Sequence, residues 1–254
     1  MFFCGLNKTT LLDYPGIVAA TVFLGGCNFR CPYCHNMELV TDPAANVSTS
    51  RDEILSHLKK RSGILKGVCI TGGEPTLNPD LPEFIMQCKD LGLKVKLDTN
   101  GTNPKMLKAL YNDGLIDHVA MDIKAGPSDY AKVAGLLQPF ETAQKTKGDP
   151  EGYKYADKIL ENVRESVRFL MNDTDREGFD YEFRTTVVKE LFNKETFNEI
   201  ADWIKNAPHY YIQPYKKPEG LKDPGFSEYT KEELLELIDL IKDRVPSAKL
   251  RGID

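Results

Sequence analysis

Short apolar runs rich in β-branched residues alternate along the chain with longer amphipathic stretches, and the alternation repeats about six times. Gly, Pro, Asn or Asp bounds each short run, which is typical of buried β-strands. The predicted strands cover residues 17–24, 67–71, 93–97, 118–123, 181–188 and 209–213. The predicted helices between and after them cover residues 50–61, 81–91, 104–112, 157–171, 194–206 and 230–244. This order predicts successive βα units around a parallel sheet.

Six βα units indicate an α/β fold, a partial (β/α)6 barrel with one open side, because a closed eight-stranded barrel needs more strands than this length offers. The 254 residues are expected to form a single domain, 1–254. Thr230 followed by Glu233 has the pattern of a capping box at the last helix. One polar stretch that contains Pro and Gly, Gln138–Tyr155, interrupts the alternation after the fourth strand. We interpret it as a functional loop insertion.

Composition narrows the class of protein. The chain has 33 Lys and Arg against 38 Asp and Glu, so its formal charge is -5, which disfavours nucleic acid as a partner. No stretch reaches the roughly 18 apolar residues of a membrane span, and the first residues lack the pattern of a signal peptide, so we expect no membrane partner and a cytoplasmic location. In a reducing compartment, clustered cysteines hold metal or do redox work more often than they form disulfides.

Three of the six cysteines are clustered directly after the first predicted strand, in the sequence GGCNFRCPYCHNM. Cys27, Cys31 and Cys34 have the spacing C-x3-C-x2-C, which lets one short loop direct three thiolates toward one point. A structural zinc site normally has four closed ligands in two separated pairs, and no second C-x2-C is present. Three thiolates would leave one iron of a four-iron cluster open for chemistry.

Two plainer interpretations stay open at this point: a loop with incidental thiols, or a zinc site that His35 completes, although His35 is poorly placed next to Cys34. The other cysteines are isolated and are interpreted as structural; they are Cys4, Cys69 and Cys88.

The cysteine motif, with the aromatic Tyr33 before its last cysteine, resembles the signature of radical S-adenosylmethionine (SAM) enzymes. The segment TGGEP after the second strand resembles the family's Gly-Gly-Glu motif, which receives the amino group of SAM. Gly72 and Gly73 let backbone approach a ligand closely, and Glu74 supplies a carboxylate for an ammonium group. The resemblance implies the partial barrel of the radical SAM type.

Within the family, the chain resembles the activating enzymes of glycyl radical enzymes, especially the activators of anaerobic ribonucleoside-triphosphate reductase. The opening TLLDYPG and the strand-end segments DTNG and MDIK are similar to those of that group. The resemblance implies further positions around SAM, in some members with a monovalent cation. These are Asp98, Thr99, Asp122, Lys124, Arg184 and the position after Gln213-Pro214-Tyr215, which is Lys216 here where formate-lyase-type activases often have histidine. The cysteine loop and these segments all begin where a predicted strand stops, which is the face where barrels place their chemistry.

The implied activity is a radical SAM oxidoreductase that works under anaerobic conditions. A 4Fe-4S cluster would reduce SAM to methionine and a 5′-deoxyadenosyl radical, with an electron from flavodoxin or ferredoxin, and the radical would take a hydrogen atom from a backbone glycine of a glycyl radical enzyme of the ribonucleotide reductase or pyruvate formate-lyase type. No acid–base residue is needed, so we assign no catalytic side chain and interpret His57 and His118 as structural. The alternatives are a radical SAM enzyme for a small molecule, such as the 7-carboxy-7-deazaguanine synthase type, and a non-catalytic metal-binding module.

Overall fold

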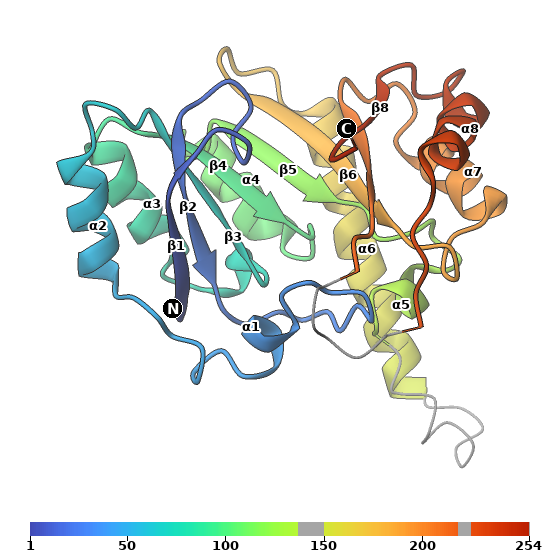
Figure 1. Ribbon diagram of the computed structural model, residues 1–254, viewed down its shortest axis with the longest axis horizontal. Helices are drawn as coiled ribbons and strands as arrows, with labels where there is room; N and C mark the ends of the chain where they lie inside the picture. Colours follow the sequence, from blue (N-terminus) through green and yellow to red (C-terminus); the bar gives the residue numbers. More distant parts are fainter. Residues whose placement is uncertain (137–149, 218–224, 254) are drawn as a thin grey trace. The chain divides into compact units, whose positions relative to one another are not determined.

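The computed structural model describes residues 1–136, 150–217 and 225–253 (Figure 1). Its strands follow one another in chain order, from β1 to β8, in one mixed sheet. By packing, the chain divides into two compact units. The first unit contains residues 1–28, 36–120 and 173–180, and the second contains residues 29–35, 121–172 and 181–254. Each unit is described by itself below.

In the first unit, strands run side by side with helices in the connections between them (Figure 1). Strand β1 (Phe3–Thr10) pairs antiparallel with β2 (Ala19–Leu24), and β2, β3 (Gly67–Gly72) and β4 (Lys94–Thr99) pair in parallel. The helical segments are α1 (Met37–Thr41), α2 (Arg51–Lys60), the 3-10 turn η1 (Pro75–Leu77), α3 (Leu81–Asp90) and α4 (Pro104–Asn112). Strand β5 (His118–Asp122) begins in this unit.

The strands of the first unit have two faces of different chemistry. Val68 and Ile70 of β3 alternate with Cys69, and Val95 and Leu97 of β4 alternate with polar residues, so the two sets lie on opposite faces of the sheet. Thr21, Cys69 and Lys96 are neighbours in register on three adjacent strands. All three are buried, so a polar row lies inside this unit beside an aliphatic core.

The second unit pairs β6 (Asp180–Val187), β7 (Tyr210–Pro214) and β8 (Ala248–Leu250) in parallel. Its helices are α5 (Tyr130–Val133), α6 (Pro150–Asn172), α7 (Lys194–Trp203) and α8 (Lys231–Ile241). Thr230 and Glu233 form the predicted capping box at the start of α8, since each side chain bonds the other's backbone N–H. No helix in the described parts of the chain is both long and apolar enough to cross a membrane.

The α/β fold class is confirmed, and all six predicted strands and six predicted helices are present. Helix α4 has the predicted bounds, and the other elements have one or both ends shifted. Two strands were not predicted. Strand β1 contains the polar run Asn7–Thr10, and β8 has only 3 residues, so neither has the long apolar run by which the others were recognised. The short helices α1 and α5 were also not predicted, because 5 and 4 residues are too few for a periodic pattern.

The interpretation of Gln138–Tyr155 as one loop is wrong at its end. Helix α6 begins at Pro150, so residues 150–155 are helical and the helix predicted from residue 157 is longer than expected. Proline was counted as evidence for a loop, but it is tolerated in the first turn of a helix, where its missing N–H has no intrahelical partner anyway. The rest of the insertion, residues 138–149, lies outside the described residues.

Backbone meets backbone where β2 and β3 end. The Gly73 N–H donates to Leu24 O and the Glu74 N–H donates to Gly26 O, both at 2.8 Å. A Cβ at Gly73 would lie 2.0 Å from Gly26 O, and a Cβ at Gly72, where φ is +115°, would lie 2.3 Å from Leu24 O. Only glycine therefore fits at these two positions.

We expect Gly73→Ala to lower the free energy of unfolding by about 1 to 3 kcal/mol, because the added methyl group forces apart two hydrogen-bonded backbone segments. Chemical denaturation measures the change. Gly63→Ala is the matched control, since a Cβ at Gly63 meets nothing within 4 Å. Equal stability of the two variants would contradict the importance of this contact.

Candidate functional site

The predicted cysteine loop starts in the first unit and continues in the second. Cys27 follows β2 in the first unit and is partly exposed, whereas Cys31 and Cys34 belong to the second. The Asn100 side-chain amide donates to Cys27 Sγ at 3.9 Å and to Asn28 Oδ1 at 2.9 Å. Sequence reasoning quoted Asn100 only as part of the DTNG segment and gave it no role. A side chain that donates to the sulfur stabilises the thiolate form that metals bind.

In the second unit, the loop is anchored at both of its ends. The Arg30 N–H donates to Ala134 O at 3.0 Å, and the His35 Nε2–H donates to Lys216 O at 3.0 Å. The His35 ring also packs against Tyr215, with centroids 5.6 Å apart. Lys216 thus contacts the cysteine loop through its backbone, while its side chain is exposed.

Burial raises the pKa of the Cys31 thiol to about 11, and the nearby Lys124 ammonium acts in the opposite direction. Thiolates are soft ligands that suit iron–sulfur clusters, and a bound metal deprotonates the thiols that it binds. The donor set of the loop therefore fits a cluster. Within residues 1–136, 150–217 and 225–253, no three His, Cys, Asp or Glu side chains are grouped so that they could hold a single metal ion.

Glu74 joins the carboxyl ends of β3 and β4 in the first unit. Its carboxylate accepts hydrogen bonds from Thr76 N at 3.0 Å, Thr76 Oγ1 at 2.5 Å, Thr99 Oγ1 at 2.8 Å and Asn100 N at 2.6 Å. Burial raises the pKa of Glu74, and these hydrogen bonds oppose that effect. Glu74 and Thr99, both predicted to lie at SAM, therefore also hold this end of the sheet together.

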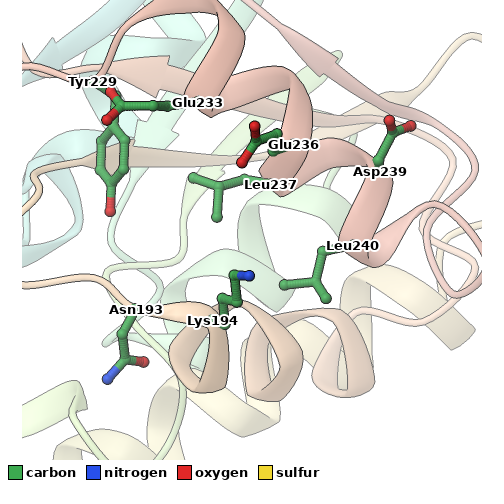
Figure 2. Close-up of a pocket in the computed structure, with 8 residues that line it drawn as sticks. All are labelled: Asn193, Lys194, Tyr229, Glu233, Glu236, Leu237, Asp239 and Leu240. Carbon is green, nitrogen blue, oxygen red and sulfur yellow. The ribbon is translucent and has the colours of Figure 1, made fainter.

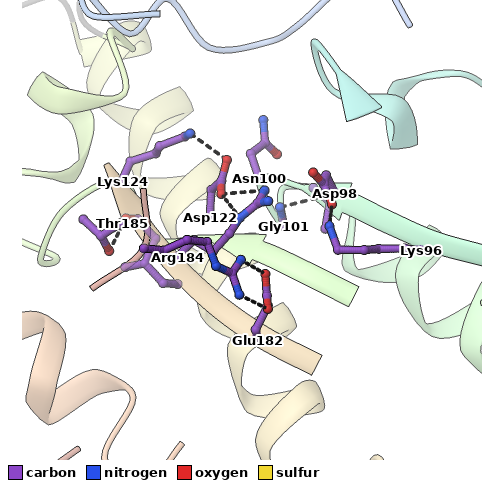
Figure 3. Close-up of polar contacts among 12 residues, drawn as sticks. Lys96, Asp98, Asn100, Gly101, Asp122, Lys124, Glu182, Arg184 and Thr185 are labelled. Atoms are coloured by element: carbon purple, nitrogen blue, oxygen red, sulfur yellow. Dashed lines mark hydrogen bonds and ion pairs between the residues drawn. The ribbon is translucent and has the colours of Figure 1, made fainter. Parts of the chain in front are cut away.

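Asp98, another predicted SAM residue, forms an ion pair with Lys96 two residues earlier in β4 (Figure 3). The Cys69 thiol lies 3.7 Å from Asp98 Oδ1 and 3.8 Å from Lys96 Nζ. Lys96 is 1% exposed, which is rare for a lysine. No hydrophobic pattern identified it, because its strand was recognised from the apolar residues on the opposite face.

Three predicted site residues meet in the second unit. Arg184 of β6 donates from Nε to Asp122 Oδ1 at 2.9 Å, and Lys124 Nζ donates to Asp122 Oδ2 at 3.0 Å (Figure 3). Burial acts to raise the pKa of Asp122, but Arg184 and Lys124 lower it to about 2. Burial likewise acts to lower the pKa of Lys124, but Asp122 keeps it well above its usual range. The trio holds one net positive charge at neutral pH.

Tyr33, between Cys31 and Cys34, is buried in the same unit. Within the described parts of the chain, its hydroxyl is a buried atom without a hydrogen-bond partner. Burial raises the pKa of the Tyr33 and Tyr130 phenols, and both lie in the electrostatic reach of Lys124 and Asp122. Tyr130 also packs edge-on against Trp203, with centroids 5.8 Å apart. Buried polar atoms without a partner mark a place where a ligand or water can bind.

A groove between α7 and α8 is separate from these residues (Figure 2). It has a volume of about 480 Å³, and none of the predicted site residues lines it. Figure 2 shows carboxylates of α8 above Lys194 of α7. Two of these carboxylates already bind lysines, Glu233 with Lys189 and Asp239 with Lys242. The groove is the surface where two helices pack side by side.

We expect Asp122→Asn to lower the free energy of unfolding by about 2 kcal/mol at neutral pH, because it leaves Arg184 and Lys124 without their shared anion. The pKa of Asp122 is lower when folded than when unfolded, so its stabilisation is complete above about pH 5 and is lost as the pH falls toward 2. The deficit of the variant should shrink over that range in denaturation experiments. Asp239→Asn, in an exposed pair with Lys242, should leave the stability unchanged within the error of the measurement. A pH-independent deficit would contradict this account.

The chain is similar in sequence to known proteins. The chain is 30% identical over 254 residues to the "Putative glycyl-radical enzyme activating enzyme MJ1227" of Methanocaldococcus jannaschii. The aligned region covers 98% of this chain and 95% of that protein. It is 36% identical over 112 residues to the "Probable GTP 3',8-cyclase" of Sulfolobus acidocaldarius, of which it spans 35%.

Solved structures at low sequence identity share the fold. SuiB of Streptococcus suis has a TM-score of 0.62 at 14% identity and covers 93% of this chain, which spans 50% of SuiB. TYW1 with a lysine–pyruvate adduct has a TM-score of 0.59 at 17% identity, covering 91% of this chain and 76% of TYW1. These likenesses are consistent with the predicted partial barrel.

The family model described as "Radical SAM superfamily" matches residues 21–166, more than half of the chain, and this range includes the cysteine loop and the Gly-Gly-Glu segment. The resemblance found in the sequence is thereby confirmed. The chain belongs to the radical SAM superfamily.

Proposed function

We propose that this protein is a glycyl radical enzyme activating enzyme. Membership of the superfamily implies a 4Fe-4S cluster and bound SAM. The observation that carries the proposal is the match to the Methanocaldococcus jannaschii protein, which extends over 98% of this chain and 95% of that one. The match to the cyclase, by contrast, extends over 43% of this chain and 35% of the cyclase. A full-length match supports a shared architecture as well as a shared cofactor domain.

Cys27, Cys31 and Cys34 would hold the cluster in this proposal. When bound, the cluster supplies the electron that cleaves SAM to methionine and a 5′-deoxyadenosyl radical, which takes the hydrogen atom from glycine. Asn100 donates to Cys27 Sγ and so stabilises its thiolate. Lys124 acts on Cys31 in the same sense by its charge.

The remaining predicted residues would bind and orient SAM. The net positive charge of Asp122, Lys124 and Arg184 suits the SAM carboxylate, and the Tyr33 hydroxyl can donate to a bound ligand. In the first unit, the Glu74 carboxylate has three donors on Oε1 and one on Oε2, so Oε2 can still accept a hydrogen bond from the SAM ammonium. Gly72 and Gly73 keep the backbone close, and Thr99, Asp98 and Lys216 complete the proposed set.

The partner would be a glycyl radical enzyme of the ribonucleotide reductase or pyruvate formate-lyase type. Flavodoxin or ferredoxin as the reductant, anaerobic operation and a cytoplasmic location stay predictions.

The test of the function is radical formation in the partner. We expect anaerobic incubation of the cluster-loaded protein, SAM and reductant with a glycyl radical enzyme to produce a glycyl radical signal in electron paramagnetic resonance. A partner variant whose radical glycine is replaced by alanine is the control. SAM cleavage without a signal from either enzyme type, together with consumption of a small nucleotide-like substrate, would support the alternative of a small-molecule radical enzyme.

A second prediction concerns the cluster ligands. The reconstituted protein should hold about four irons per chain, and Cys27→Ser, Cys31→Ser or Cys34→Ser should reduce both iron content and SAM cleavage to background. Cys88→Ser is the matched control, because Cys88 is a buried thiol of helix α3. Iron analysis and methionine release are the measurements, and equal losses in all four variants would refute the ligand assignment.

A further inference from the structure

The Lys96–Asp98 pair places a charged lysine inside the first unit. Lys96 is 1% exposed, and its ammonium lies against the Asp98 carboxylate and 3.8 Å from the Cys69 sulfur. Figure 3 shows the amine of Lys96 directed at that carboxylate. Cys69 and Lys96 are register neighbours on β3 and β4, so the ammonium lies on the same face of the sheet as the Cys69 thiol.

A buried ion pair is a costly way to fill this space. Removing two charges from water costs several kcal/mol per ion in general, and a well-packed apolar pair is often as stable or more stable. Stability alone therefore does not explain why a lysine lies inside this sheet. The free-energy cost of burying the lysine is explained if its role is to keep the Asp98 carboxylate charged and oriented at the end of β4.

The place is the carboxyl end of β4, where the first unit has its predicted SAM residues. Asp98 precedes Thr99, whose hydroxyl donates to Glu74, and Asn100, whose amide donates to Cys27 Sγ. Asp98 itself retains some exposure, with 14% of its side chain accessible, whereas Lys96 has 2%. The pair thus presents the carboxylate outward and keeps its counter-ion behind it.

We propose that Lys96 is a built-in monovalent cation: its ammonium neutralises and orients Asp98 for SAM binding, so this protein needs no bound K+ or Na+ there. The inference rests on the proposed SAM site and concerns a positioning residue. An ammonium and a potassium ion carry the same charge and both bind carboxylates, but a tethered ammonium is already in place. Without the lysine, a cation of similar size from solution can take the place of the ammonium beside the Asp98 carboxylate.

The experiment compares Lys96→Ala with the native protein in chloride buffers of equal ionic strength that contain K+, ammonium or tetramethylammonium, which is too large to enter. We expect the native protein to bind SAM with one affinity in all three buffers. Lys96→Ala should bind roughly tenfold or more weakly in tetramethylammonium, because a charge-assisted hydrogen bond is lost. K+ or ammonium should restore its affinity saturably. Anaerobic calorimetry on cluster-loaded protein measures the affinity.

A second readout does not require SAM. The melting temperature of Lys96→Ala should rise with K+, whereas that of Lys96→Ala/Asp98→Asn, which lacks both charges, should not. This double variant also keeps the test decisive if the single variant folds poorly. Lys94→Ala is the matched control, since Lys94 is an exposed lysine of the same strand and should behave like the native protein.

Three results would overturn the proposal: native SAM binding that depends on K+, no response of Lys96→Ala to K+ or ammonium in either readout, or the same response in Lys94→Ala. None of these measurements involves a glycyl radical enzyme. A failure to form a glycyl radical would therefore refute the proposed function and leave this inference standing. One of the three results above would refute the inference and leave the proposed function standing.

Discussion

The contact between the ends of β2 and β3 is the constraint on which the first unit depends. Gly72 and Gly73 lie so close to Leu24 and Gly26 that no side chain fits between them. Two backbone hydrogen bonds at 2.8 Å seal this contact. Cys27 follows directly on one side and Glu74 on the other, so the positions of a candidate cluster ligand and of a buried carboxylate are both set by backbone rather than by flexible side chains.

Buried charge is handled differently in the two units. In the first unit, the Glu74 carboxylate accepts four hydrogen bonds from uncharged groups. In the second, Asp122 has two cations, Arg184 and Lys124. The first arrangement fixes strand ends, and the second creates an excess of positive charge.

The sequence alone was sufficient to locate the strands and helices with strong hydrophobic patterns and to identify the motif residues. The apolar runs located six strands, and the cysteine spacing with TGGEP identified the superfamily. The sequence did not reveal how the side chains pair. Lys96 and Asn100 are polar residues whose surroundings include contacts from other strands or loops, at Cys69 and Cys27. Such pairings depend on register, which no periodic pattern specifies for polar positions.

Trp203 gives the second unit a tryptophan fluorescence signal that the first unit lacks. Trp203 is the single tryptophan of the chain, and it lies in helix α7 beside the ring of Tyr130. Its fluorescence therefore reports on one unit alone. Loss of that emission signal, compared with a backbone signal from the whole chain, would reveal whether the two units melt together or in sequence.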